Sequence, residues 1–155
     1  MAALLWAGRP QAVLFACRLN AVRSPMAAAL FRHTFGRSAY VGSAGVLKGE
    51  PDAFAVAAME EIGLDISRHR PMSFEELEDW EGLNFDLIIT LAPEAHHKAL
   101  ELTRMIAADV EYWPTSDPTL AEGSREQRLD SYRVVRDLLM RRIKSRFAPA
   151  GPGNE

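Results

Sequence analysis

Cys17 and Arg23 are separated by five residues in the segment CRLNAVRS, and this spacing suits a loop that binds phosphate beside a nucleophile. A phosphate monoester needs several donors on its oxygens and a nucleophile in line with the leaving group. Backbone N–H groups at a helix N-terminus and the forked guanidinium of Arg23 would supply the donors. Their positive field favours the thiolate form of Cys17, which could attack phosphorus and form a phosphocysteine. Ser24 could donate a hydrogen bond to that sulfur and help it to leave.

The alternative is that Cys17 is a buried cysteine that simply ends a core strand, which is a common structural role. That alternative does not explain the polar residues that follow at once, namely Asn20, Arg23 and Ser24. We therefore favour a phosphate-binding loop, called here the Cys17 loop. Besides Cys17 and Arg23 it contains Arg18, Leu19, Asn20, Ala21, Val22 and Ser24.

Asp117 is the candidate proton donor for the leaving alkoxide or phenoxide. Pro118 follows it and restricts Asp117 to extended geometry, which can hold the carboxyl over a neighbouring loop. The same carboxyl would later activate the water that hydrolyses the intermediate. An Asp-Pro pair by itself more often marks a turn, so this role depends on its pairing with the Cys17 loop.

The surrounding elements must bring these groups together. Residues 12–17 form a continuous apolar run, typical of a strand that is buried on both faces of a parallel sheet. Similar reasoning predicts further strands over 39–43, 85–91 and 110–113, and helices over 26–35, 52–63, 93–105 and from Ser124 to Phe147, with a short capped helix from Ser73. Strand–helix alternation implies parallel strands in an α/β three-layer sandwich with helices on both faces. Ligands of such sheets bind beyond the carboxyl ends of the strands, where Cys17 and residues 113–118 lie.

Composition narrows the class of protein. The 155 residues suit one domain, expected over 1–150 with a disordered tail over 151–155, and the net charge of −3 implies no bulk attraction to nucleic acid or to a membrane. A single cysteine excludes an intramolecular disulfide and a cysteine-based zinc cluster. No signal peptide or membrane-spanning run is evident, so we expect a cytoplasmic protein that is a monomer or a weak dimer. The basic residues near 141–146 are interpreted as complements of the helix dipole.

The Cys17 loop resembles that of the low-molecular-weight protein tyrosine phosphatase family, which shares its fold with one class of arsenate reductases. The family pattern, Cys-x-Gly-Asn-x-x-Arg-Ser-Pro after an apolar strand, is matched at Cys17, Asn20, Arg23, Ser24 and Pro25. Further family segments are matched in order along the chain, at Ser43-Ala44-Gly45, Gly63-Leu64-Asp65 to His69, Phe85-Asp86-Leu87-Ile88 and Asp117-Pro118. The resemblance covers about residues 10–147 and implies a four-stranded sheet in the order 2-1-3-4.

The resemblance also implies a supporting network around the loop. In the family, the loop asparagine adopts a left-handed conformation, for which Asn is among the least costly residues after Gly. Its partners are the equivalents of Ser24, Ser43 and His69. His69 is therefore expected to position the loop rather than to relay protons. Because Arg23 and backbone amides carry the charge of phosphate, we expect no metal and no cofactor.

Three departures from the family pattern bear on specificity. Leu19 stands where the family has Gly, and Val22 stands where many members have a second cysteine. Thr119 and Leu120 replace the aromatic residues that flank a phosphotyrosine ring. Two cations, Arg18 and Lys48, are expected at the edge of the site. These differences leave phosphoryl chemistry intact and weaken the aromatic clamp.

Three functions therefore remain open. The favoured one is a phosphomonoesterase, a protein (tyrosine) phosphatase in which Cys17 attacks, Arg23 clamps and Asp117 acts as acid and then as base. It would act on a phosphorylated protein or on a small phosphomonoester. An arsenate reductase would have to use an external small thiol, because the chain has no further cysteines. A non-catalytic phosphate- or phosphopeptide-binding module is the third.

Overall fold

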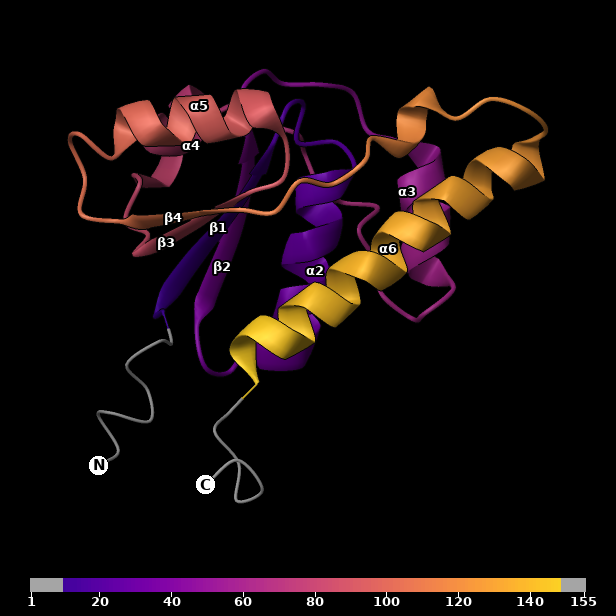
Figure 1. Cartoon of the computed structure of the whole chain (residues 1–155), viewed down its shortest axis with the longest axis horizontal. Helices are drawn as coiled ribbons and strands as arrows, with labels where there is room; N and C mark the ends of the chain where they lie inside the picture. Colours follow the sequence, from indigo (N-terminus) through magenta and orange to yellow (C-terminus); the bar gives the residue numbers. More distant parts are fainter. Residues whose placement is uncertain (1–9, 149–155) are drawn as a thin grey trace.

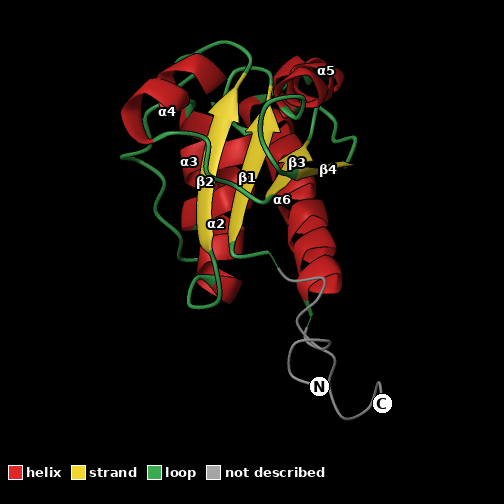
Figure 2. Ribbon diagram, turned by 90° about the vertical axis from the view of Figure 1, so that its left-hand side faces the viewer, coloured by secondary structure: helices red, strands yellow, loops and turns green. Residues whose placement is uncertain are grey.

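The computed structural model describes residues 10–148, so the predicted tail over 151–155 lies outside the described residues. Four parallel strands form one sheet. The strand β1 (Ala12–Cys17) lies between β2 (Tyr40–Gly45) and β3 (Leu87–Thr90), and β4 (Asp109–Tyr112) pairs with β3. The order β2-β1-β3-β4 confirms the predicted α/β arrangement, and the strands run side by side in Figure 2.

Helices cover both faces of this sheet (Figure 1). On one face lie α2 (Arg23–Phe35), α3 (Ala53–Glu60) and α6 (Arg125–Phe147). On the other lie α4 (Phe74–Glu81) and α5 (Pro93–Leu102). A short 3-10 turn, η1 (Pro118–Leu120), follows β4. Within residues 10–148, no helix combines the length and the apolar character needed to cross a bilayer.

Side chains of β1 alternate between two hydrophobic cores. Val13 and Phe15 pack with residues of α2 and α6, whereas Leu14 and Ala16 pack with residues of α4 and α5. All four are fully buried, which explains why the strand reads as an unbroken apolar run. Packing against both faces of the sheet therefore fixes the position of β1 and of its last residue, Cys17.

Local capping sets where several helices begin. Ser73 and Ser124 each form a reciprocal capping box with the residue three positions later, as their sequences predict. Asp52 caps α3, because its Oδ1 accepts from the backbone N–H groups of Phe54 and Ala55 at 2.9 and 3.1 Å. The helix predicted over 52–63 is shorter than expected at its other end, because α3 stops at Glu60 and residues 61–63 form a turn.

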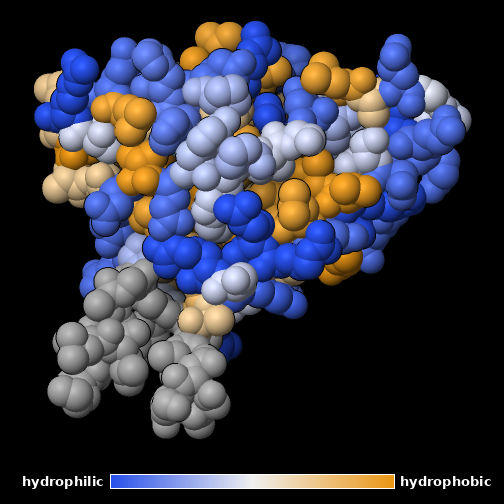
Figure 3. Space-filling view, in the orientation of Figure 1, coloured by the Kyte–Doolittle hydropathy of each residue, from blue (hydrophilic) through white to orange (hydrophobic). Residues whose placement is uncertain are grey.

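The C-terminal half of α6 carries the basic residues, and hydrophilic side chains gather over it in Figure 3. Arg142 lies over the ring of Trp113, with 4.9 Å between the guanidinium carbon and the ring centroid. Arg146 donates to Glu111 Oε2 at 2.8 Å. Two of these cations are thus engaged by the neighbouring strand region, which supports the structural interpretation of this cluster over a nucleic-acid site.

Candidate active site

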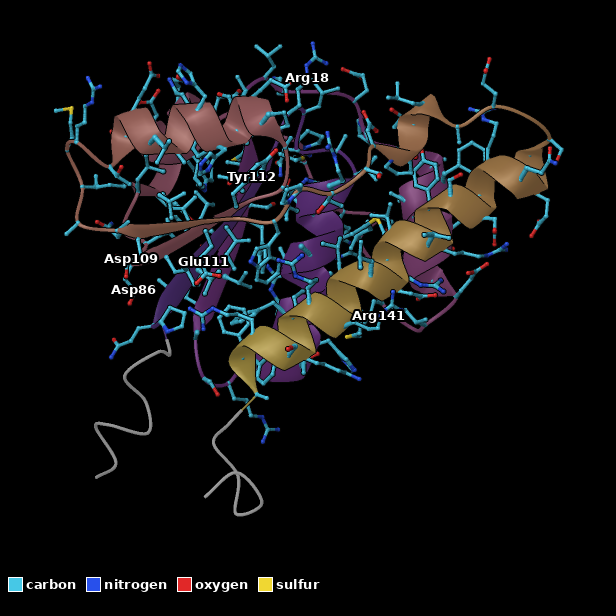
Figure 4. The ribbon with its side chains drawn as sticks, in the orientation of Figure 1. Arg18, Asp86, Asp109, Glu111, Tyr112 and Arg141 are labelled. Carbon is cyan, nitrogen blue, oxygen red and sulfur yellow. The ribbon has the colours of Figure 1, made fainter. Side chains whose placement is uncertain are left out.

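The Cys17 loop connects the end of β1 directly to α2, at the carboxyl end of the sheet. Helix α2 begins at Arg23, its N-cap Val22 makes no side-chain capping bond, and its first turn holds no acidic residue. The positive end of the helix therefore points its N–H groups into the loop without a local anion to neutralise them. Arg18 lies at this end of the sheet, whereas Asp86 lies at the opposite end (Figure 4).

Asn20 is the centre of the loop. It is fully buried and has φ 54°, the only positive φ of a non-glycine residue in the described chain. Its Nδ2 donates to Ser24 Oγ at 2.8 Å and to Ser43 Oγ at 2.9 Å. Its Oδ1 accepts from the backbone N of Met72 at 2.9 Å. One amide side chain thus ties the loop to α2, to β2 and to the segment before α4.

His69 holds the same residue from the backbone side. Its Nε2 lies 2.8 Å from the carbonyl oxygen of Asn20. Since a carbonyl oxygen only accepts, Nε2 carries the hydrogen and donates it. Burial lowers the pKa of His69 below its ordinary value, so the ring is held in its neutral form near pH 7. This geometry suits a residue that positions the loop.

The sulfur of Cys17 faces donors within the loop. Cys17 is 2% exposed, and its Sγ lies 3.0 Å from Ser24 Oγ and 3.3 Å from the backbone N of Asn20, which donates to it. Ser24 Oγ accepts from Asn20 Nδ2, and its single hydrogen can be donated either to the sulfur at 3.0 Å or to the carbonyl oxygen of Ala44 at 3.4 Å. The shorter distance favours donation to the sulfur. Both contacts stabilise negative charge on sulfur, as a thiolate nucleophile and leaving group requires.

Arg23 links the Cys17 loop to the segment that follows β4. Its side chain is largely buried, and its Nη1 donates to the carbonyl oxygen of Thr115 at 3.0 Å. Its Nη2 lies 3.9 Å from Asp117 Oδ2. Asp117 has extended backbone angles, φ −87° and ψ 108°, as expected for a residue before Pro118. The Cys17 thiol, the Arg23 guanidinium and the Asp117 carboxyl therefore share one site.

These groups line a pocket of about 350 Å³. The residues around it are Cys17, Arg18, Leu19, Ala21, Val22, Arg23, Glu50, Pro51, Asp52, Asp117 and Thr119. Of the two cations expected at its edge, Arg18 lines the pocket and Lys48 does not. The Nζ of Lys48 instead lies 3.6 Å from Glu76 Oε2. Glu50 and Asp52 add carboxylates to the wall, so the edge is mixed in charge rather than cationic.

Leu19 fits into the loop because Gly49 faces it. A Cβ on Gly49 would lie 2.8 Å from Leu19 Cβ, and Gly49 N donates to the Leu19 carbonyl oxygen at 2.9 Å. Leu19 itself has no positive φ. The Leu19 side chain is therefore accommodated because Gly49, on the opposing segment, has no side chain.

Sequence reasoning missed two contributors to the site. Asp52 was expected only to open a helix, yet its carboxylate lines the pocket and its Oδ2 accepts from the buried Tyr132 hydroxyl at 2.9 Å. The sequence marks Thr119 only as a residue that stands in place of an aromatic one, yet its hydroxyl donates to Asp117 Oδ1 at 2.7 Å. An Asp-x-Thr spacing is a signal for such a local bond. Nothing in the local sequence around Asp52 indicates a partner on α6.

Within residues 10–148, no three or more His, Cys, Asp or Glu side chains gather in a way that could hold a metal ion. The donors that could receive an oxyanion are the loop backbone and Arg23.

Comparison with known proteins places this site in a family. The sequence profile described as "Low molecular weight phosphotyrosine protein phosphatase" matches residues 12–148, which include Cys17, Arg23 and Asp117. The chain belongs to this family. The matched residues include all four strands of the sheet and the whole Cys17 loop.

Named members of the fold differ in activity. An arsenate reductase from Bacillus licheniformis is 35% identical over 140 residues, which cover 90% of this chain and 96% of that protein. The low molecular weight protein tyrosine phosphatase from T. tengcongensis has a TM-score of 0.69 at 27% identity, covering 86% of this chain and 95% of that one. The YwlE arginine phosphatase from Geobacillus stearothermophilus has a TM-score of 0.67 at 27% identity, covering 90% and 91%.

Proposed function

We propose that this protein is a phosphomonoesterase, a protein phosphatase that works through a phosphocysteine on Cys17. The observation that carries the proposal is the position of Cys17 Sγ, which lies 3.0 Å from Ser24 Oγ. In the same site, Arg23 Nη2 lies 3.9 Å from Asp117 Oδ2. This set supplies a nucleophile, a clamp for phosphate oxygens and a proton donor. The roles of the individual residues are part of the proposal.

The reaction has two steps. Cys17 attacks phosphorus while Arg23 and the loop N–H groups hold the equatorial oxygens, and Asp117 protonates the departing oxygen. Asp117 then takes a proton from water, which attacks the phosphocysteine and releases phosphate. Ser24 donates to the sulfur and stabilises the thiolate that leaves. His69 and Ser43 keep the Asn20 turn in place and do not touch the substrate.

The name arsenate reductase among the relatives makes that activity the second candidate. Arsenate resembles phosphate in shape and charge, so the same loop would bind it. Its reduction to arsenite needs two electrons, and the single cysteine of this chain cannot supply them by forming an internal disulfide. An external thiol would be required, and for this reason phosphate ester hydrolysis is favoured.

We propose that the natural substrate carries its phosphoryl group on an amino-acid side chain. Thr119 and the exposed Leu120 follow Asp117 where aromatic residues would flank a phosphotyrosine ring, and Glu50 and Asp52 line the same pocket. Carboxylates suit a cationic leaving group such as the guanidinium of phosphoarginine. The two substrates to compare are therefore phosphotyrosine peptides, whose leaving atom is oxygen, and phosphoarginine peptides, whose P–N bond would make nitrogen the atom that Asp117 protonates.

Rapid mixing with p-nitrophenyl phosphate tests the proposal. A burst of p-nitrophenol that matches the enzyme concentration is expected, followed by a slower steady rate. Cys17→Ser should abolish turnover but still bind inorganic phosphate, because the loop N–H groups and Arg23 remain. Turnover by Cys17→Ser would refute the nucleophile. Phosphate binding without turnover by the unmodified protein would favour a binding module, and arsenate-dependent oxidation of added glutathione would favour the reductase.

A further inference from the structure

The two oxygens of the Asp117 carboxyl are in different surroundings. Oδ1 accepts from the backbone N of Thr119 at 3.0 Å and from Thr119 Oγ1 at 2.7 Å. Oδ2 is the oxygen that lies 3.9 Å from Arg23 Nη2. Two donors occupy the two acceptor positions of Oδ1, whereas Oδ2 lies toward the guanidinium that closes the Cys17 loop.

We propose that Thr119 is a positioning residue that keeps the transferable proton of Asp117 on Oδ2. The proposal rests on the function proposed above. A hydrogen on Oδ1 would meet the backbone N–H of Thr119 and would end the hydrogen bond that Thr119 Oγ1 donates, so the protonated carboxyl carries its hydrogen on Oδ2. Thr119 thus selects the oxygen near the reacting groups, and it does so without contact with the reacting atoms.

The proton then moves along a balanced path. In the first step the S–P bond forms, the bond from phosphorus to the leaving oxygen breaks, and the proton passes from Oδ2 to that oxygen. In the second step water forms a new O–P bond, the S–P bond breaks, and one water proton returns to Oδ2. Cys17 leaves as a thiolate, and the enzyme regains its starting state.

A purely local role for Thr119 predicts something different. Its backbone N–H already closes the Asp117 turn that caps η1, and this bond survives any substitution of the side chain. Thr119 is exposed, so its hydroxyl contributes little to packing. If the hydroxyl only stabilised the turn, its loss would slow all substrates equally. If it directs the proton, its loss matters most for substrates whose leaving group needs protonation.

The experiment compares Thr119→Val, which keeps the shape and removes the hydroxyl, with Thr119→Ser, which keeps the hydroxyl. For Thr119→Val, kcat/KM should fall about tenfold on phenyl phosphate and no more than about twofold on p-nitrophenyl phosphate, a fraction of the effect of a full acid. Thr119→Ser should stay within about twofold of the unmodified enzyme on both substrates. Thr103→Val, the same change at the partly buried threonine that caps the C-terminal end of α5, is the matched control.

A second arm places Thr119→Val in an Asp117→Ala background. If Thr119 acts through Asp117, the second change has no further effect. Equal losses on both aryl phosphates, a loss that persists in the Asp117→Ala background, or no loss at all would each overturn the assignment. If the unmodified enzyme hydrolyses neither aryl phosphate, the proposed function itself is refuted and the assignment falls with it. Hydrolysis by the unmodified enzyme is therefore measured before any variant is compared.

Discussion

Replacing Asn20 by alanine tests whether one buried amide holds the Cys17 loop in shape. The substitution removes three hydrogen bonds, two donated by Nδ2 to Ser24 and Ser43 at 2.8 and 2.9 Å and one accepted by Oδ1 from Met72 N at 2.9 Å. It also forces alanine into the left-handed conformation that Asn20 adopts at φ 54°. Both effects destabilise the folded protein.

The magnitude follows from these terms. The three hydrogen bonds, one buried and two partly buried, contribute about 1 kcal/mol each, hence about 3 kcal/mol in total. The left-handed conformation costs alanine about 1 kcal/mol more than asparagine. The free energy of unfolding should therefore fall by about 4 kcal/mol, a large share of the 5–15 kcal/mol (roughly) that domains possess. Loss of the loop shape should also lower kcat/KM.

Urea unfolding followed by circular dichroism measures this change. Asn84→Ala is the matched control, because Asn84 is exposed and the same substitution there should cost less than about 0.5 kcal/mol. Asn20→Gly removes the same three bonds but adopts the left-handed conformation readily, so it separates the two terms. If Asn20→Ala unfolds at the same urea concentration as Asn84→Ala, the amide does not hold the loop.

Three further predictions concern the surroundings of the site. A Cβ on Gly45 would lie 2.7 Å from the backbone of the Cys17 loop, so Gly45→Ala should lower both stability, by about 1–3 kcal/mol, and kcat/KM, as urea unfolding and kinetics would show. Hydrogen bonds from Arg133 hold the pKa of Glu61 at about 2 rather than its ordinary 4.5. The charged carboxylate therefore stabilises the fold above pH 4.5, and this contribution is lost as the pH falls through about 2. Arg133→Ala should flatten the acid side of a curve of unfolding free energy against pH. Tyr132→Phe should cost about 1 kcal/mol in thermal unfolding, because the Asp52 carboxylate loses a buried donor; an unchanged Tm would exclude that contribution.

Much of the architecture was predictable because its signals are local. An unbroken apolar run indicates a strand buried on both faces, and β1 carries alternate residues into two cores. Capping boxes at Ser73 and Ser124 depend on residues three positions apart, and both are present. The α/β sandwich and the strand order were confirmed. Element ends were less exact, since side-chain caps such as Asp52 and tertiary pairing decide the last residues.

Cys17 and Arg23 were recognisable from the sequence because one short loop contains both, and a strand must end where that loop begins. The family resemblance implied that Asn20 meets Ser43 and His69, and the structure shows both contacts across separations of 23 and 49 residues. Tertiary structure alone decided the bond from Met72 N, across 52 residues. Parallel strands place the ends of distant segments at one edge of the sheet, and no local pattern encodes which of their atoms will lie within 3 Å, as the 2.9 Å hydrogen bond from the Tyr132 hydroxyl to Asp52 Oδ2 illustrates.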